Sequence, residues 1–340
     1  MTPGLRVGIT YDLREFYLAK GYSPEAVAEF DKPGTVAGIE AALLSLECQV
    51  ERIGNLEALV QRLARGESWD LVFNIAEGLY GYAREAQVPA LLEGYAIPCV
   101  FSDAFTLALC LHKAFTKSVI RDAGLPTPAF RIFPSPGWEL ESAGLTYPLF
   151  IKPVGEGTGK GVSGRGKISE AAALGPAVRE LAQRFSQPVL VEEFLPGREF
   201  TVGIVGSGEK ARVLGVMEVI LLPNAEPEVY SFENKDQYLD RVEYRLASDS
   251  TALAAGETAL ASYRLLGCRD GGRVDLRSDR EGVPNFMEIN PLAGLDPVHS
   301  DLPIICRLQG IAYQELIGWI VESASERLPE RKKGQGSQVS

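Results

Sequence analysis

The chain is poor in the residues that build disulfide frameworks and histidine metal sites. Its five cysteines are scattered and form no C-x-x-C pair, so we expect small core residues in a reducing compartment rather than disulfides or a zinc site. They are Cys48, Cys99, Cys110, Cys268 and Cys306. Only two histidines occur, His112 and His299, so we expect no histidine-based metal site and assign both histidines structural roles.

The chain also lacks a long apolar run and an excess of positive charge. No stretch approaches the roughly 20 apolar residues of a membrane-spanning helix, and the first apolar run is too short for a signal peptide. The 45 acidic residues outnumber the 34 basic ones, which gives a net charge of −11. Such a chain repels nucleic-acid phosphate and anionic lipid, so we expect a cytoplasmic protein with no nucleic-acid or membrane partner.

The first third of the chain alternates between strand and helix patterns. Buried strands are predicted at residues 5–10, 49–53 and 69–75, with helical spacing of apolar residues at 35–46 and 56–65. This alternation predicts an α/β unit with a parallel sheet. Ligands bind beyond the carboxyl ends of the strands in such sheets, which is where the segment AEGLYG follows the third strand.

A further strand and helix are predicted before a second unit begins near residue 124. A strand is predicted at residues 97–102 and a single long helix at 105–123, followed by the turn residues Gly124 and Pro126. Two strands joined by a turn at residues 279–282 predict a hairpin within residues 271–291. The polar stretch from residue 327 onward is predicted to be a disordered tail.

A glycine-rich loop at residues 155–166 follows a predicted strand that contains Lys152. Glycines let a backbone approach phosphate closely and turn its N–H groups toward it, and a lysine adds a point charge. The loop is not a Walker A sequence, because Gly161 follows Lys160 where that motif has Ser or Thr. Taken alone, the pattern fits a flexible surface loop as well as a phosphate site.

Two further motifs carry carboxylates on apolar strands. In VLVEEFLPGREFTV, a strand that enters a short linker suits an adenine edge, and a later carboxylate suits ribose hydroxyls. Taken alone, however, this motif favours a solvated strand edge. In the predicted hairpin, Glu288 and Asn290 face one side, opposite a strand that carries Asp275. Crowded acids on an apolar strand favour Mg²⁺ over ordinary surface acids. Arg273 is placed to neutralise a transferred phosphoryl group.

The order of these motifs resembles that of the ATP-grasp superfamily, and within it the D-alanine–D-alanine ligases. IKP, the glycine-rich loop, VEEFLPGREFTV, RVD and EINPLAGLDPVHSDLP occur in the order that is typical of the family. NIAEGLYGYAREAQVPALLE, IPCVFS and HKAFTK extend the similarity over roughly residues 71–324. No single motif decides the matter, but the ordered set is specific.

The resemblance implies a role for each matching residue. The residues implied to bind ATP are Lys113, Lys152, Glu156, Gly157, Thr158, Gly159, Glu192, Glu193, Leu195 and Glu199. The residues implied to hold Mg²⁺ or Mn²⁺ are Asp275, Glu288 and Asn290. Those implied to act in catalysis are Arg273, Gly294, Thr158 and Tyr238, and Ser300 is implied to receive the carboxylate of the acceptor.

The chain departs from the family pattern around the first substrate. The family's G-G-x-S-x-E-x-x-V-S stretch is replaced by TYDLREFYLAKGYSPE, so the glutamate that anchors the substrate's amine has no clear counterpart, with Glu15 only a guess. The family's histidine beside the first substrate falls on Glu77, and its loop lysine falls on Gln237. We predict that Glu77, Arg84 and Glu85 contact substrate. D-Alanine itself does not follow from the sequence.

The resemblance implies an α/β protein with the ATP-grasp fold. We expect a Rossmann-like domain at residues 1–111, a small lid domain at 112–192, a larger C-terminal α+β domain at 193–326 and a tail at 327–340. The implied function is ATP-dependent, ADP-forming ligation of a small carboxylate, such as an amino acid, to an amine through an acyl-phosphate, in a homodimer. Two alternatives stay open. One is an imine-forming ligase that condenses an amino acid with a mycosporine-type carbonyl, and the other is a nucleotide-binding protein without turnover.

Overall fold

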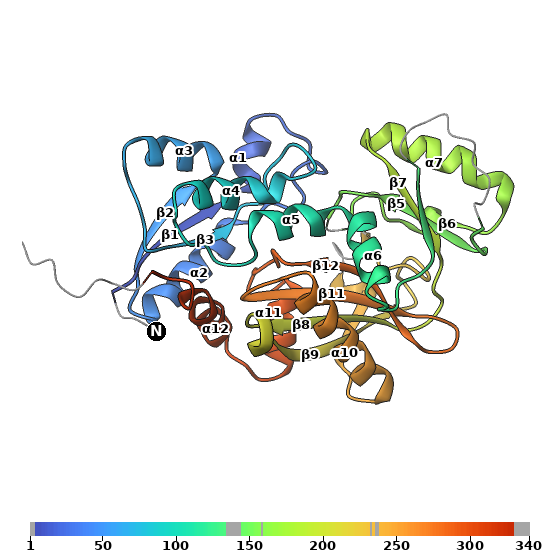
Figure 1. The fold of residues 1–340 in the computed structure, drawn as a ribbon. Coiled ribbons are helices and arrows are strands. Elements are labelled where there is room, and N and C mark those ends of the chain that lie inside the picture. Colours follow the sequence, from blue (N-terminus) through green and yellow to red (C-terminus); the bar gives the residue numbers. More distant parts are fainter. Residues whose placement is uncertain (1–3, 134–143, 158, 232, 235–237, 330–340) are drawn as a thin grey trace, which may run out of the picture.

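The computed structural model describes residues 4–133, 144–157, 159–231, 233–234 and 238–329, whose strands form three sheets flanked by helices (Figure 1). One sheet lies in the N-terminal part, a small sheet lies at the opposite end of the molecule, and a larger sheet lies below and between them. Among the described residues, no helix combines the length and the apolar character needed to cross a lipid bilayer.

The N-terminal sheet is parallel and has the strand order β2-β1-β3. Its strands are β1 (Arg6–Tyr11), β2 (Gln49–Gly54) and β3 (Leu71–Ile75). The helices of this part are α1 (Arg14–Ala19), α2 (Pro33–Ser45), α3 (Leu56–Ala64) and α4 (Gln87–Gly94). Every side chain of β3 is buried, as expected for a strand covered on both faces. The predicted parallel α/β unit is therefore confirmed.

The strand predicted at residues 97–102 is wrong in extent. It contributes only an isolated parallel bridge between Cys99 and Val72. Pro98 has no N–H to donate to a ladder, and Phe101 has a φ of 73°, which ends the extended backbone conformation.

The single helix predicted over residues 105–123 is wrong, because the chain forms two helices, α5 (Ala104–Leu111) and α6 (Lys113–Asp122). His112 has a ψ of 86°, which is not helical, and its ring nitrogen Nδ1 accepts a hydrogen bond from the backbone N–H of Phe115 at 3.2 Å. This is an N-cap interaction, so the histidine side chain starts a new helix. The break places Lys113 at the first residue of α6, where its backbone N–H donates to the carbonyl of Val154.

The small sheet is antiparallel and has the order β4-β7-β5-β6. Its strands are β4 (Phe130–Phe133), β5 (Leu149–Pro153), β6 (Lys167–Ile168) and β7 (Val189–Glu193). Helix α7 (Ala171–Phe185) covers the outer face of this sheet (Figure 1). Buried residues of α7, including Leu174 and Val178, pack with strand residues into one apolar cluster, so the inner face of the sheet is left for a ligand.

The larger sheet is antiparallel and has the order β10-β9-β8-β11-β12. Its strands are β8 (Glu199–Val205), β9 (Arg212–Leu221), β10 (Val242–Leu246), β11 (Gly271–Ser278) and β12 (Pro284–Asn290). The accompanying helices are α9 (Tyr238–Arg241), α10 (Ser250–Leu265), α11 (Asp301–Leu308) and α12 (Tyr313–Ser325). The predicted hairpin is confirmed as β11 and β12, and Asp279 closes its turn by accepting the backbone N–H of Val283 at 2.8 Å.

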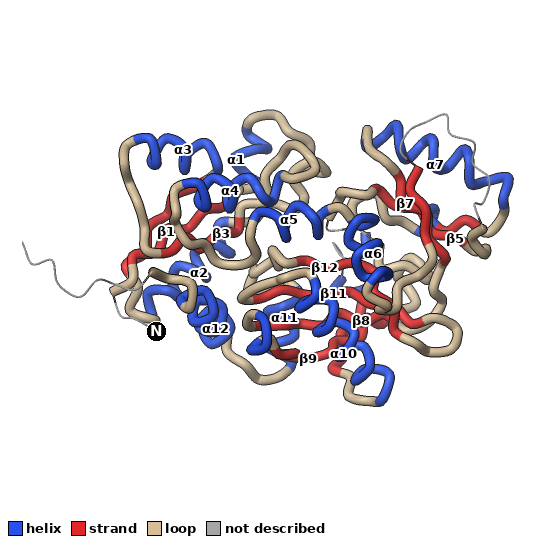
Figure 2. Tube along the Cα trace, viewed as in Figure 1, coloured by secondary structure: helices blue, strands red, loops and turns tan. Residues whose placement is uncertain are grey.

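The first and last parts of the chain share one apolar core. Helix α12 lies beside α2 (Figure 2), and buried residues of both helices, such as Ile39 and Ile320, belong to the same cluster as strand β1. The predicted domain boundaries stay a prediction, but this core joins α12 to the N-terminal unit. Arg327, predicted to begin the tail, is held by the buried Asp270 at 2.6 Å, and residues 330–340 lie outside the described residues.

Candidate active site

Two cavities open along the β11–β12 hairpin. The cavity between the small and the larger sheet, here called the inter-sheet cavity, has a volume of about 90 Å³ and is lined by Asp275 and Glu288. The second, here called the acidic cavity, has a volume of about 280 Å³ and is lined by Arg273 and Asn290 of the same two strands. Tyr230 lines both cavities, so they are neighbours.

The inter-sheet cavity brings together most of the residues predicted to bind ATP. It is lined from the small sheet and its loop by Lys113, Lys152, Glu156, Gly159, Glu192 and Glu193, and from the larger sheet side by Leu195, Glu199, Asp275 and Glu288. These residues lie up to 175 positions apart in the sequence (288 − 113 = 175), and the two facing sheets bring them to one cleft. Thr158 lies outside the described residues.

A buried ion triad supports one wall of this cavity. The carboxylate of Glu192 lies 2.8 Å from Nζ of Lys152 and 2.9 Å from Nζ of Lys117, and solvent does not reach Glu192 or Lys117. Burial lowers the pKa of Lys117 to about 8, and the attraction of Glu192 partly offsets this. Glu192 was predicted to bind ATP, but its side chain is engaged by the two lysines. Lys117 was not predicted at all.

Hydrogen bonds and an ion pair hold the glycine-rich loop at several positions, which argues against the flexible-loop alternative. The backbone N–H of Gly155 donates to Gln187 at 2.7 Å, and that of Gly157 donates to Glu29 at 2.7 Å. Glu156 forms an ion pair with Lys160 at 2.8 Å, and its carbonyl accepts a hydrogen bond from Nζ of Lys113. The loop is therefore held close to the lysines with which it was predicted to share a phosphate.

The hairpin places the predicted metal ligands next to one another. Asp275 and Glu288 are directly paired across the two antiparallel strands, and Arg273 and Asn290 form a neighbouring pair. Asp275 contacts the guanidinium of Arg273, and Glu288 lies 3.5 Å from Nζ of Lys113. Paired carboxylates with an amide oxygen nearby form a set of hard oxygen donors that suits Mg²⁺. Within the described residues, no cluster of three His, Cys, Asp or Glu side chains could hold a metal, so a metal at these two carboxylates would need a further donor such as Asn290 or a ligand.

The acidic cavity holds most of the remaining predicted catalytic and substrate residues. It is lined by Glu77, Glu85, Arg273, Gly294 and Ser300. A Cβ atom at Gly294 would lie 2.8 Å from the Ser300 hydroxyl, so a side chain there would collide with it. The Ser300 hydroxyl accepts the backbone N–H of Asp296 at 3.0 Å, which fixes the turn before α11.

Two predicted site residues lie elsewhere. Arg84, predicted to contact substrate, does not line the acidic cavity but donates to the carbonyl of Gly155 at 2.8 Å and to Glu29 at 3.1 Å. A buried guanidinium needs such partners, and in this structure Arg84 finds them in the loop and in Glu29, while its contact with substrate stays a prediction. Tyr238 lines neither cavity, but its hydroxyl lies 3.0 Å from Nδ1 of His299, which does line the acidic cavity. Gln237 lies outside the described residues.

Four carboxylates of the acidic cavity were missed by sequence reasoning. They are Glu29, Asp31, Asp296 and Asp301. Glu29 and Asp31 follow the TYDLREFYLAKGYSPE stretch and belong to none of the family motifs quoted above, so only the folded chain reveals that they reach the cavity. Glu15, the guessed amine anchor, lies on α1 and is not among the lining residues.

Several of these carboxyls titrate far from their usual range. Burial, together with the nearby Asp296 and Asp12, raises the pKa of Asp31 to about 7. Burial and the charge of Glu29 raise the pKa of Glu85 to about 7, and burial and Glu85 raise the pKa of Glu77 well above its ordinary value. These shifts reflect the cost of gathering like charges where water is scarce.

The chain is similar in sequence to known proteins over most of its length. Residues 119–322 match the family described as D-ala D-ala ligase C-terminus. The D-alanine–D-alanine ligase of Bordetella pertussis is 34% identical over 299 residues, which cover 87% of this chain and 91% of that protein.

Solved structures share the fold at lower identity. The D-alanine–D-alanine ligase of Bacillus anthracis, solved in complex with ATP, superposes with a TM-score of 0.72 at 21% identity and covers 95% of this chain and 98% of that one. The VanG D-Ala:D-Ser ligase of Enterococcus faecalis gives a TM-score of 0.72 at 20% identity, with 94% of this chain and 99% of that one covered. The expected three-sheet α/β architecture is therefore that of the ATP-grasp ligases.

Proposed function

Because this chain belongs to the D-alanine–D-alanine ligase family, we propose that it joins the carboxylate of an amino acid to an amine through an acyl-phosphate, with ATP converted to ADP. The observation that carries the proposal is the meeting of two cavities at the β11–β12 hairpin. Phosphate-binding lysines line one cavity, and Arg273, Gly294 and Ser300 line the other.

The inter-sheet cavity is proposed to hold the nucleotide. Lys113 and Lys152 would neutralise its phosphates, and the glycine-rich loop would cover them with backbone N–H groups. Glu193 and Leu195 border the cavity where an adenine would lie, and Glu199 is available to accept hydrogen bonds from ribose hydroxyls. Glu192 would act indirectly, by holding Lys152 in place.

The acidic cavity is proposed to hold the amino acid and the attacking amine. The amino acid's carboxylate would attack the terminal phosphorus, and the amine would then attack the acyl carbonyl and displace phosphate. Arg273 and the backbone N–H of Gly294 would hold the negative charge that develops on the carbonyl oxygen, and Ser300 would bind the acceptor. The chain supplies positioning and charge stabilisation instead of a covalent nucleophile.

The oxygen donors of the hairpin fit a divalent cation. Asp275, Glu288 and Asn290 would hold Mg²⁺ or Mn²⁺, which offsets phosphate charge when it is bound. In the described structure, the carboxylate of Asp275 lies beside Arg273, and the carboxylate of Glu288 lies beside Lys113. The arrangement suits a metal that arrives together with the nucleotide.

The proposal extends to the setting of the reaction. The substrates are small molecules, and we place the reaction in the cytoplasm, where ATP is supplied. We also infer a homodimer without a nucleic-acid or membrane partner. Light scattering of the purified chain during gel filtration tests the dimer, because a mass close to one chain would contradict it.

ADP release measured against a panel of D- and L-amino acids and small ketones tests the function. Release that requires an amino acid and is lost in Glu288→Ala supports the ligase. Release only with a ketone co-substrate would instead identify the imine-forming alternative, and ATP binding without turnover would identify the non-catalytic one. The comparisons with known proteins support neither alternative.

A further inference from the structure

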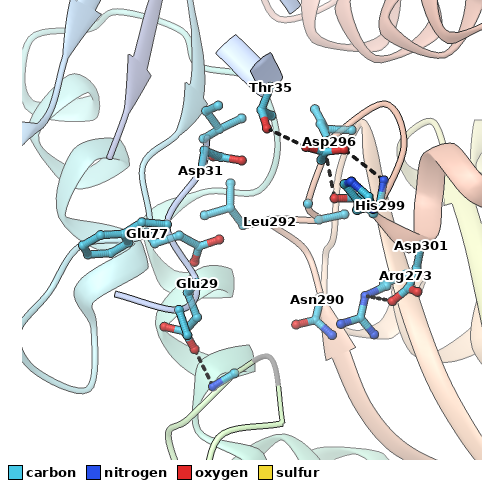
Figure 3. A pocket seen from close by; sticks show the side chains of 18 of the residues that line it. Glu29, Asp31, Thr35, Glu77, Arg273, Asn290, Leu292, Asp296, His299 and Asp301 are labelled. Carbon is cyan, nitrogen blue, oxygen red and sulfur yellow. Dashed lines mark hydrogen bonds and ion pairs between the residues drawn. The ribbon is translucent and has the colours of Figure 1, made fainter. Parts of the chain in front are cut away.

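The acidic cavity contains more carboxyl groups than the ammonium group of an ordinary amino acid can pair with. Six carboxyl groups line it, from opposite walls: Glu29, Asp31, Glu77 and Glu85 come from N-terminal segments, and Asp296 and Asp301 from the C-terminal part. Figure 3 shows Glu77 and Asp31 on one wall and Arg273 and Asn290 on the other. The cavity between these walls is the one proposed above to hold the substrates.

Two of the six carboxylates are neutralised by the protein itself. Glu29 lies 3.1 Å from Arg84 and 3.2 Å from Lys160. Although burial acts to raise it, these two cations hold the pKa of Glu29 below its usual value. Asp301 lies 3.3 Å from the guanidinium of Arg273.

The other four carboxyls have no such partner. Within the described part of the chain, Asp31, Glu77, Glu85 and Asp296 form no ion pair within 4.0 Å. Arg14 and Lys32 also line the cavity, but neither pairs with these four groups among the described residues.

Asp296 receives only neutral donors. Its carboxylate accepts the backbone N–H groups of Val298 and His299 at 2.9 Å and the hydroxyl of Thr35 at 3.4 Å. Glu77 accepts no hydrogen bond from any residue that the structure describes, and its half-buried side chain points into the cavity (Figure 3). A carboxyl that points into a cavity without a partner is a site where a ligand cation is favoured.

Charge balance then limits what the cavity accepts. A zwitterionic amino acid brings one ammonium group and one carboxylate. Arg273 lies on the wall opposite Glu77 and is the group proposed to face the reacting carboxyl. One α-ammonium group can pair with one or two of these four carboxyls, and a second cationic group on the substrate would pair with the others and favour their ionised form.

We propose that the amino acid activated by this chain carries a cationic side chain, an ammonium or a guanidinium group, that binds between Asp31, Glu77 and Asp296. The inference rests on the proposed ligase function and names the substrate class of that same site. It also accounts for the acid at Glu77, where the family pattern has histidine, because a carboxylate attracts a cation and a protonated histidine repels one.

Pairs of amino acids that differ in side-chain charge but little in shape test the proposal. ADP release would be measured with lysine and norleucine, and with arginine and citrulline, each as the D- and the L-form. We expect kcat/KM for the charged member of a pair to exceed that of its neutral match by about thirtyfold or more, as for desolvated charge pairs. Comparison of lysine, ornithine and arginine separates an ammonium from a guanidinium preference.

Variants connect the preference to the named residues. Glu77→Gln and Asp31→Asn keep the side-chain shape and remove the charge, so each should reduce the ratio between lysine and norleucine by about tenfold or more. Glu243→Gln, on the exposed face of β10, serves as the matched control and should leave the ratio unchanged. If the ratio between lysine and norleucine is the same in the wild type and in Glu77→Gln, then this carboxyl does not select for the charge of the substrate's side chain.

The outcomes separate the two proposals. If neutral amino acids support ADP release as well as charged ones do, the ligase function stands and the cationic substrate is refuted. If no amino acid supports release, the ligase function fails, and the inference is then decided by calorimetric titration of lysine and norleucine into the chain with Mg-ADP. Equal or absent binding of the two would overturn the inference as well.

Discussion

The Nζ atom of Lys117 lies 2.9 Å from the carboxylate of Glu192, and neither side chain is exposed to solvent. The same carboxylate holds Lys152, which faces the inter-sheet cavity, so the two lysines share one buried acid. Lys117 also donates to the hydroxyl of Thr127 at 2.9 Å and to the carbonyl of Phe286 at 3.1 Å. One buried ammonium therefore links the small sheet to strand β12 of the larger sheet.

Lys117→Met should destabilise the fold strongly, because it leaves Glu192 with a single cation and removes two buried hydrogen bonds. We expect the free energy of unfolding to fall by about 1–3 kcal/mol, as is typical when buried acceptors lose their donor, because Lys152 still neutralises Glu192. Urea denaturation followed by far-UV circular dichroism measures the change. Lys210→Met, which removes an exposed pair with Glu326, should change it by about 0–1 kcal/mol. Equal effects of the two substitutions would contradict this assignment.

Arg273→Lys should impair turnover much more than nucleotide binding. The guanidinium of Arg273 is oriented by Asp275 and Asp301, and a lysine cannot present the same fork of donors. We expect kcat to fall by about 10²- to 10³-fold, as for the loss of an oxyanion-stabilising group, with little change in the Kd for Mg-ATP. Arg245→Lys, on the exposed end of a pair with Glu218, is the control. An unchanged kcat in Arg273→Lys would remove this arginine from the mechanism.

Asp275→Asn and Glu288→Gln should each weaken the binding of Mg²⁺, so that activity requires a higher Mg²⁺ concentration. Each change replaces a charged oxygen donor by a neutral one in a directly paired position of the hairpin. The Mg²⁺ concentration for half-maximal ADP release should rise by about tenfold or more. Glu281→Gln, in the exposed turn between the same strands, should leave the Mg²⁺ titration unchanged. Identical titrations for all three variants would place the metal elsewhere.

Asp31→Asn should stabilise the ligand-free protein at alkaline pH. The pKa of Asp31 is raised to about 7 in the fold, so the folded state holds this proton more tightly than the unfolded chain does. The protonated carboxyl therefore contributes stability at low pH, and this contribution is lost as the pH rises through about 7. The charged groups that oppose its ionisation are Asp12 beyond β1 and Asp296 in the loop before α11.

Thermal unfolding at pH 5 and pH 8 measures this effect. The midpoint of Asp31→Asn should exceed that of the wild type at pH 8, and the difference should shrink at pH 5, where the wild-type carboxyl is protonated. Asp122→Asn, on the exposed end of α6, should show no such pH dependence. If Asp31→Asn instead lowers the unfolding midpoint equally at both pH values, then the fold does not oppose the ionisation of Asp31.

The parts of the site that depend on local patterns could be predicted from the sequence. The β11–β12 hairpin follows from its turn residues and alternation, and the pairing of Asp275 with Glu288 follows from the hairpin. Lys152 and the glycine-rich loop were found because they are adjacent in the sequence. The long-range order of these motifs supplied the family resemblance, and this resemblance identified the fold and the reaction class.

The parts that depend on tertiary contacts could not be predicted. Glu29 reaches Gly157 across 128 positions, and no local pattern marks such a contact. The break at His112 escaped notice because apolar residues continue across it and neither proline nor glycine stands there. The contact of Arg84 with the Gly155 carbonyl could not be predicted, because burial, and not residue type, decides which group a guanidinium faces.

The packing of α12 against α2 has a consequence for biogenesis. The apolar faces of β1 and α2 leave the ribosome early, but their covering helix is among the last described segments to be made. During translation, the apolar surface of the nascent N-terminal unit therefore stays exposed until α12 has been synthesised. Such a surface is a substrate for chaperones, and a chain that stalled before residue 313 would be expected to aggregate instead of waiting as a folded domain.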